Sequence, residues 1–153
     1  MDVICRGNRL IGVDLEGQDL SLADFSSDTI EDCNFSYTNL AGAKFPFSKI
    51  KNCNFTGAKL IGAIFADSEF ENCDFSYSNL IGSNLDSVYC KNSKFINCKL
   101  IGCSSKKGKF KSSNFENAKF LGADLEAAYF YQCDLTNTDF SRSNITDIDL
   151  SDD

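Results

Sequence analysis

Large apolar side chains recur at every fifth residue of the chain. Of the 30 positions from Cys5 to Leu150 whose numbers are divisible by five, 13 hold Phe, 11 Leu, three Ile and two Cys, and Ser105 is the single polar residue. The residue two places earlier is Ala, Ser, Cys, Thr or Val in 25 of these 30 units. Helices repeat apolar residues about every 3.6 residues and strands every 2, so neither explains this pattern. We expect each unit to bury one large and one small side chain and then turn a corner.

A second period, of 20 residues, indicates how many corners close one turn. Glycine recurs at this spacing from Gly42 to Gly122, and cysteine at Cys33, Cys53 and Cys73. Four five-residue units therefore make one coil, and the 30 units give about seven coils. Repeats that cannot bury an apolar face alone must stack on their neighbours, so the sequence predicts a solenoid. At a strand spacing of about 4.8 Å, the rod would be roughly 35 Å long.

The five-residue unit resembles the signature of the pentapeptide repeat proteins, in which a small residue and then Asp or Asn precede a central Leu or Phe. Ala23-Asp24-Phe25, Cys33-Asn34-Phe35 and Ala123-Asp124-Leu125 carry the resemblance, which covers essentially the whole chain. It implies an all-β, right-handed quadrilateral β-helix, a pentapeptide repeat solenoid. Length and composition predict a single domain over residues 1–153. Lysine replaces the Asp or Asn at seven positions, including Lys44, Lys59, Lys99 and Lys119.

Eight cysteines in 153 residues are frequent in secreted disulfide scaffolds, but here all eight occupy inward columns. Stacked cysteines such as Cys33 and Cys53 would hold their Cβ atoms near the coil spacing, outside the roughly 3.5–4.5 Å that a disulfide favours. A column of thiols also lacks the tetrahedral arrangement that zinc prefers. We therefore expect free thiols that fill the core of a cytoplasmic protein, with no metal and no cofactor.

The sequence contains no arrangement typical of an enzyme or of a membrane protein. It has no histidine, so a Ser or Cys nucleophile would lack its usual base. The glycines recur at the coil spacing and do not form a phosphate-binding GxGxxG. The recurrent Asp and Asn have a structural use, because their side chains bond nearby backbone in turns. No apolar run approaches the roughly 20 residues of a membrane span, and no secretory signal is evident.

The candidate interaction surface is a row of apolar residues on one side of the coil. The residue after each centre should point outward, and in this row each one is followed by glycine. At the coil spacing, the row would form a patch of roughly a few hundred Å², the size at which exposed apolar surface indicates partner binding. Alternatively, glycine only supplies a turn with positive φ, and the apolar side chains fold over their neighbours. The row comprises Ala41, Ile61, Ile81, Ile101 and Leu121.

These observations predict a non-enzymatic, rigid scaffold for protein–protein interaction, with a homodimer as the simplest partnership. The resemblance implies an alternative, because some pentapeptide repeat proteins mimic B-form DNA, bind type II topoisomerases such as gyrase, and protect them from quinolones or toxins. Such mimicry needs continuous negative potential along the rod. Residues 1–40 and 121–153 are acidic, but residues 41–120 carry 12 lysines and only six acids.

The lysine cluster around Ser105 is the remaining anomaly of the sequence. Lys106, Lys107, Lys109 and Lys111 lie close together, but such runs usually form a solvated face, and an overall pI near 4.5 opposes direct nucleic-acid binding. Ser105 itself should weaken the core, because a buried hydroxyl without a partner costs roughly 1–3 kcal/mol. Two further surface features are expected: an amide ladder along one column, and three tyrosines on one side, Tyr89, Tyr129 and Tyr131. The ladder column comprises Asp32, Asn52, Asn72, Asn92, Ser112 and Gln132.

Overall fold

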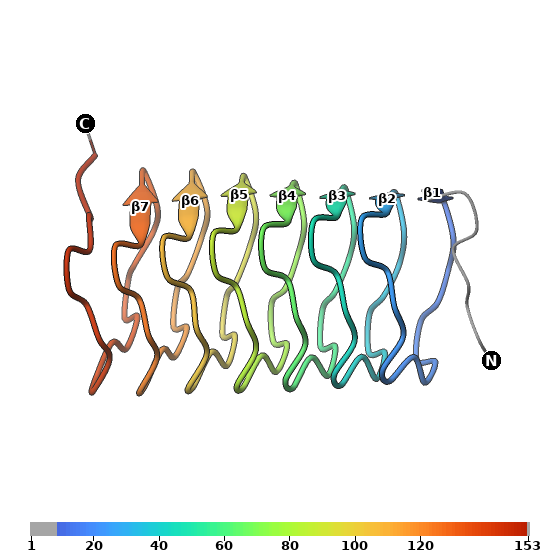
Figure 1. Cartoon of the computed structure of the whole chain (residues 1–153), viewed down its shortest axis with the longest axis horizontal. Coiled ribbons are helices and arrows are strands. Elements are labelled where there is room, and N and C mark those ends of the chain that lie inside the picture. Colours follow the sequence, from blue (N-terminus) through green and yellow to red (C-terminus); the bar gives the residue numbers. More distant parts are fainter. Residues whose placement is uncertain (1–8, 153) are drawn as a thin grey trace.

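Seven short strands form one parallel sheet in the order of the chain. The computed structural model describes residues 9–152, so the expected centre at Cys5 lies outside the described residues. Figure 1 shows the strands side by side along the long axis, and β1 and β7 are six complete turns apart. The all-β solenoid with its 20-residue coil is therefore confirmed. The strands are β1 (Arg9–Ile11), β2 (Thr29–Glu31), β3 (Lys49–Lys51), β4 (Glu69–Glu71), β5 (Tyr89–Lys91), β6 (Lys109–Lys111) and β7 (Tyr129–Tyr131).

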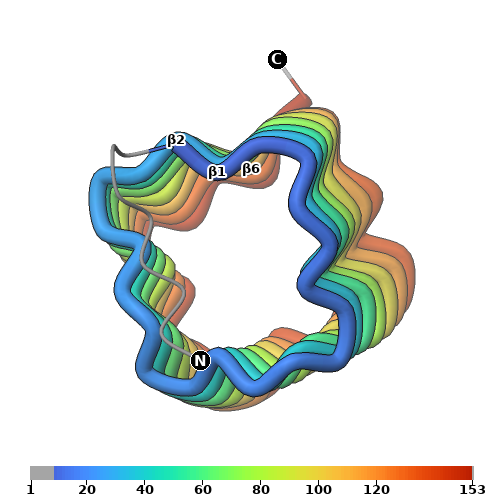
Figure 2. Tube along the Cα trace, turned by 90° about the vertical axis from the view of Figure 1, so that its right-hand side faces the viewer, coloured from blue at the N-terminus to red at the C-terminus, as the bar shows by residue number. Residues whose placement is uncertain are grey.

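The coil has four sides, and its successive turns superpose when viewed along the axis (Figure 2). The strands form the first side. On the other three sides, successive coils pair through single β-bridges between residues 20 apart, such as Asp14 with Asn34 and Asp24 with Lys44. On every side the backbone N–H of a centre donates to the next coil; for example, Phe35 donates to the Asn54 carbonyl at 2.7 Å. The sheet-like pairing therefore continues around the whole coil, although only one side is assigned as strand.

Every corner turns through one residue in the left-handed backbone region. This residue is the second after each centre, and from Gly12 to Asp147 its φ lies between 51° and 69°. Eight of these corner residues are glycine and 20 are not, including the bulky Phe47 and Tyr77. The left-handed conformation costs a residue with a side chain about 1–2 kcal/mol. The fold compensates for this cost because the corner N–H bonds to the coil above, as in Tyr77 N to Ile96 O at 2.9 Å.

The centres form four columns of stacked side chains inside the coil. On the second side, the phenyl rings from Phe35 to Phe115 lie 4.7–5.0 Å apart with interplanar angles of 7° or less. Rings of neighbouring columns meet edge-on, as Phe25 and Phe35 do at 5.9 Å and 85°. Both geometries are favourable for aromatic pairs. All central side chains from Leu15 to Phe130 are 5% exposed or less, which confirms the predicted core.

Ser105 is accommodated better than the sequence suggested. It is fully buried between Leu85 and Leu125 on the fourth side, but its Oγ donates a hydrogen bond to the Leu85 carbonyl at 3.3 Å. The expected cost of an unpartnered hydroxyl is therefore absent at this position. Gly108 provides the space, because a Cβ there would collide with Ser105 Oγ. Within residues 9–152, the buried side-chain polar atom that lacks a partner is Ser83 Oγ.

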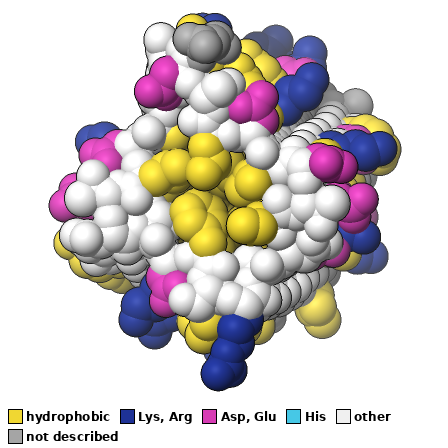
Figure 3. All heavy atoms as spheres, turned by 90° about the vertical axis from the view of Figure 1, so that its left-hand side faces the viewer, with side chains coloured by type: hydrophobic (Ala, Val, Ile, Leu, Met, Phe, Trp, Pro, Cys, Tyr) yellow, Lys and Arg dark blue, Asp and Glu magenta, His cyan; other side chains and the backbone are white. Residues whose placement is uncertain are grey.

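The C-terminal end of the described rod leaves its core open. Figure 3 looks onto this end and shows apolar side chains in the middle of the coil, surrounded by polar atoms. Ile145 and Leu150 are 50% and 49% exposed, whereas Phe130, one coil earlier, is 1% exposed. The centres of the last described coil are less buried than those of the interior coils. We therefore expect this coil to open first.

The left-handed corners predict opposite effects for the same substitution at two adjacent residues. Ala127 is a corner residue with φ of 56°. Ala128 is the small residue two places before the core residue Phe130, and it is fully buried. Ala127→Gly should raise the free energy of unfolding by about 0.5–1 kcal/mol, because glycine adopts this φ without strain. Ala128→Gly should lower it by about 0.5–1 kcal/mol. Urea unfolding of both variants measures the difference, and a loss of stability in Ala127→Gly would contradict the account.

Candidate functional site

The predicted apolar row lies at the corner between the third and fourth sides, and we call it the apolar stripe. It comprises Ala41, Ile61, Ile81, Ile101 and Leu121. Ile61 is 37% exposed, and the other four members are partly buried. The carbonyl oxygens of the four larger members accept hydrogen bonds from glycines one coil earlier, as Ile81 does from Gly62 at 3.0 Å, and that of Ala41 accepts from Leu22. The stripe is therefore held in register by the backbone but offers less apolar area than full exposure would give.

A bare glycine strip runs beside the stripe. A Cβ added at Gly62, Gly82, Gly102 or Gly122 would meet no atom within 4 Å, so crowding does not require glycine at these four positions. Positive φ favours glycine at these corners, as the alternative interpretation of the sequence predicted. Elsewhere in the rod, however, 20 corner residues with a side chain adopt the same conformation. Glycine in successive coils therefore has a second consequence. It leaves flat, open backbone beside the stripe.

The opposite flank of the stripe is basic and polar. Lys59, Lys99 and Lys119 are exposed on the third side, and they alternate in part with asparagines of the same column. Asn79 Oδ1 accepts a hydrogen bond from the Ile81 N–H at 3.1 Å, which fixes the stripe's backbone. The surface thus combines an apolar row, a flat strip and a row of lysines.

Six of the seven cysteines that the structure describes are buried in the core, and Cys133 is partly buried. The seven cysteines in the described chain are free thiols, and Cys73 Sγ donates to the Ile50 carbonyl at 3.4 Å. Burial raises the pKa of four of them to about 12, which leaves no thiolate at neutral pH. No cluster of His, Cys, Asp or Glu suited to a metal ion occurs in residues 9–152. The four thiols are those of Cys73, Cys90, Cys98 and Cys103.

Cys33 and Cys53 form a coupled pair in the same column. A hydrogen bond between their thiols raises the pKa of Cys53, and burial raises it further. The same bond lowers the pKa of Cys33 to about 7. Cys33 is nevertheless 2% exposed, so a reagent cannot reach its sulfur without opening the first coils. The pair therefore behaves as core filling.

The recurrent carboxylates serve the turns, as the sequence analysis predicted. Asp24 Oδ1 accepts hydrogen bonds from the hydroxyl and the N–H of Ser26, and these bonds lower the pKa of Asp24. The amide ladder is confirmed over three coils, because Asn72 donates to Asn52 and Asn52 to Asp32, each at 3.2 Å. The side-chain bonds that the structure shows in this column do not extend to the expected members Asn92, Ser112 and Gln132. These polar groups stabilise corners and contacts between coils. They form no paired acid and base.

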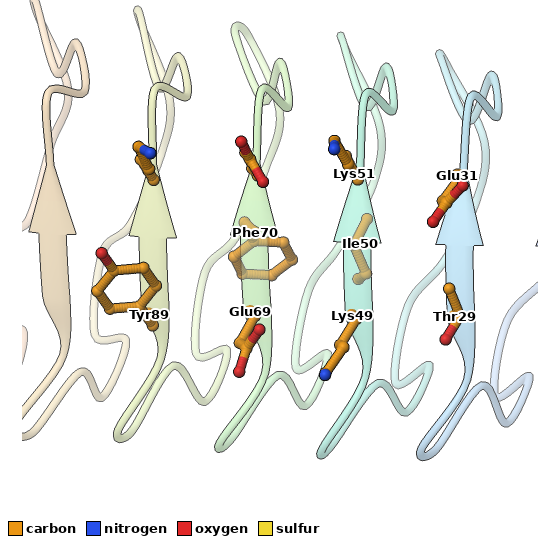
Figure 4. Close-up of a pocket in the computed structure, with 10 residues that line it drawn as sticks. Thr29, Glu31, Lys49, Ile50, Lys51, Glu69, Phe70 and Tyr89 are labelled. Atoms are coloured by element: carbon orange, nitrogen blue, oxygen red, sulfur yellow. The ribbon is translucent and has the colours of Figure 1, made fainter.

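The strand side carries a surface that the sequence analysis did not single out. A shallow groove of about 200 Å³ spans β2 to β5, and Figure 4 shows the side chains on its two flanks. The residues before and after each centre point outward, and β3 contributes two lysines where β4 contributes two glutamates. The sequence signal for this surface lies in the residues directly before and after every fourth centre.

The predicted tyrosines gather further along the same side. The rings of Tyr129 and Tyr131 on β7 are stacked with centroids 6.0 Å apart, and Lys111 Nζ lies 5.5 Å from the Tyr131 ring centroid. Tyr89 is 43% exposed on β5. The three tyrosines line a second shallow depression together with the lysines of β6. The lysine cluster is thus divided, because Lys106 turns to Asp124 and forms an ion pair at 3.4 Å.

Comparisons with known proteins agree with this architecture. A family model described as "Pentapeptide repeat region" matches residues 73–150, and one described as "Pentapeptide repeats (8 copies)" matches residues 9–46 and 53–89. No curated protein sequence matches the chain. The part of the chain that the structure describes has no helix that could cross a membrane.

Among solved structures, the chain is similar to QnrB1, described as a plasmid-mediated fluoroquinolone resistance protein. Full-length QnrB1 aligns with a TM-score of 0.58 and 18% identity, covering 94% of this chain and 84% of QnrB1. A trypsin-treated form of QnrB1 aligns with a TM-score of 0.53 and 17% identity, covering 94% of this chain and 89% of that form. At these identities the likeness establishes the shared fold alone.

The buried thiols predict that stability falls in alkaline solution. In the unfolded chain a thiol ionises near a pKa of about 8.5, whereas Cys73, Cys90, Cys98 and Cys103 retain their protons up to about pH 12. Between these pH values the unfolded state binds fewer protons, so the free energy of unfolding decreases by about 1.4 kcal/mol per pH unit for each thiol. Urea unfolding at several pH values above about 8.5 measures this slope.

The variant C98A/C103A provides the control for this prediction. It lacks two of the four thiols whose pKa is about 12, so its stability should decrease less steeply with pH than that of the unsubstituted chain. Tyrosine and lysine ionisation affect both proteins equally. Identical slopes for the two proteins would show that these thiols are not held neutral in the folded state.

Proposed function

Because the chain belongs to the pentapeptide repeat family, we propose that it is a non-enzymatic, rigid scaffold that binds another protein. The observation that carries the proposal is the apolar stripe beside a strip of bare glycine backbone. Both run along the rod through successive coils whose cores are continuous. A partner that docks there meets a surface already fixed by backbone hydrogen bonds, so little ordering entropy opposes binding.

The flanks of the stripe indicate the chemistry of this partner. Ile61, Ile81 and Ile101 provide apolar contacts, and the neighbouring lysine row provides positive charge on one side only. Flat backbone on the glycine side lets an extended segment approach closely. The complementary partner presents apolar side chains beside acidic ones. Its contact with the apolar row supplies affinity, and contact with the lysines sets its orientation.

Substitution of Ile81 tests this surface. Ile81→Lys should abolish binding, because it places a charge in the middle of the apolar row. Ile64→Lys is a matched control, since Ile64 is also partly buried but lies on the fourth side, one coil above Lys44. Affinity capture from extract of the source cells, with quantitative mass spectrometry, compares the three proteins. Partners should be retained by the unsubstituted chain and by Ile64→Lys and lost from Ile81→Lys; equal retention by both variants would contradict the proposal.

The distribution of acids favours this scaffold over DNA mimicry. No two acidic residues of the sequence are 20 positions apart, so no column stacks one carboxylate directly on another. Lysines do stack in this way, as Lys91 with Lys111 and Lys99 with Lys119. A DNA mimic needs continuous negative potential along one face. The fold shared with QnrB1 does not provide that potential.

A supercoiling assay separates the two functions. Purified gyrase is titrated with this protein, in the presence and absence of a fluoroquinolone. We expect neither inhibition of supercoiling nor rescue from the drug at protein concentrations well above that of gyrase, because the rod lacks an acidic face. Concentration-dependent inhibition, or rescue, would replace the scaffold proposal with the topoisomerase alternative.

A further inference from the structure

The strand side displays its charges in pairs that alternate in sign. Each strand turns its centre inward and its two flanking residues outward, and we call these two outward side chains a rung. The β3 rung is Lys49 and Lys51, and the β4 rung is Glu69 and Glu71. Figure 4 shows the rungs arranged in two rows along the rod. Neighbouring rungs on β3 and β4 therefore carry two positive and two negative charges.

Ion pairs within the chain do not use these charges. Over residues 9–152, the one ion pair closer than 4.0 Å joins Lys106 and Asp124, which lie away from the strand side. Lys49, Lys51 and Glu69 are exposed, and Glu71 is partly buried. Alternating charge along each row still favours the alignment of neighbouring strands. The charged groups themselves remain available to another molecule.

Of the two ways to relate the strand sides by a two-fold axis, only the antiparallel one brings the opposite rungs of β3 and β4 together. If two copies pack their strand sides in parallel around an axis along the rod, each rung meets its own equivalent, and Lys49 faces Lys51. If the copies run antiparallel around a two-fold axis between β3 and β4, Lys49 faces Glu69 of the second copy and Lys51 faces Glu71 of the second copy. Like charges that face each other repel, so the order of the rungs along the rod favours the antiparallel arrangement.

The next strands outward follow the same complementarity. In the antiparallel arrangement the β2 rung, Thr29 and Glu31, meets the β5 rung, Tyr89 and Lys91, of the second copy. Glu31 then faces Lys91, and the hydroxyl of Thr29 faces Tyr89. Counting both halves of the symmetric contact, all charged groups from β2 to β5 meet an opposite charge. No other register between the two rods achieves this over four consecutive strands.

We propose that the strand side is a self-recognition surface, through which two copies of this chain associate as an antiparallel dimer with its two-fold axis between β3 and β4. This goes beyond the proposed scaffold function, because it uses a different side of the rod and leaves the apolar stripe free for a partner. Four strands about 4.8 Å apart cover roughly 20 Å of the rod, so the contact is small and its affinity is weak and reversible.

The β6 rung provides a matched control. Lys109 and Lys111 lie on the same side and in the same two rows as Lys49 and Lys51. In the proposed dimer they face Arg9 and Ile11 of the second copy, so they form no favourable pair. K49E/K51E and K109E/K111E therefore change the net charge by the same amount. Of the two rungs, only that of β3 faces a rung of opposite charge in the proposed dimer.

Sedimentation equilibrium tests the proposal over roughly 10 μM to 1 mM protein, the range of weak association. We expect the unsubstituted chain to dimerise, K49E/K51E to raise the dissociation constant on the order of 100-fold, and K109E/K111E not to weaken association. E69K/E71K should also be monomeric alone. An equimolar mixture of K49E/K51E with E69K/E71K should dimerise again, because each variant then meets opposite charges at both rungs.

Salt gives a readout that needs no substitution. Raising NaCl from about 0.1 M to about 1 M shortens the Debye length from about 10 Å to about 3 Å, so association of the unsubstituted chain should weaken. Three results would overturn the proposal: a monomer throughout the concentration range, undiminished dimerisation of K49E/K51E, or no association in the mixture. Association that persists in high salt and is lost in Ile81→Lys would instead place the dimer contact on the apolar stripe.

Discussion

The stacking of each coil on the next, 20 residues further along the chain, is the constraint on which the rest of the structure depends. It holds the phenyl rings of the second side 4.7–5.0 Å apart and aligns every centre with its equivalents. It also allows the corner N–H groups to bond to the next coil, which maintains left-handed conformations at residues as large as Tyr77. Most of the stabilising free energy therefore arises between coils.

The same constraint makes the surface regular. A residue type repeated every 20 positions becomes a row along the rod, as the apolar stripe and its glycine strip do. Because the backbone fixes these rows, partner recognition depends on which side chains the columns carry. The apolar stripe and the strand side lie on different parts of the coil, so one rod can present two independent contact surfaces. Neither surface needs a catalytic group.

Much of the fold could be predicted from the sequence because the five-residue period has no interruption. Centres such as Phe75 are buried as expected, and so are the small residues two places before them, such as Cys73. Asp24 accepts a hydrogen bond within its turn, as expected. The partner of Ser105 could not be foreseen, since it is a carbonyl of another coil. Nor could the conformation of Phe47, because local preference opposes a left-handed phenylalanine and only the contact with the next coil overrides it.

The candidate site was predicted less completely. The position of the apolar stripe follows from the period, but the partial burial of Ile81 and Ile101 depends on how their side chains pack. The paired rungs of β3 and β4 were overlooked because their meaning appears only when residues on both flanks of a centre are compared between coils. The period thus determines where side chains lie. The use of a surface depends on charge and shape that a period does not encode.

Amide hydrogen exchange along the unsubstituted chain tests most directly whether contacts between coils hold this protein together. We expect the amides of β3, β4 and β5 to exchange slowest and at similar rates. Protection should decrease toward β1 and toward the last described coil, because a terminal coil has one neighbour and an interior coil has two. Exchange in β4 as fast as in the last coil, or one interior coil that opens while both its neighbours stay protected, would contradict this expectation.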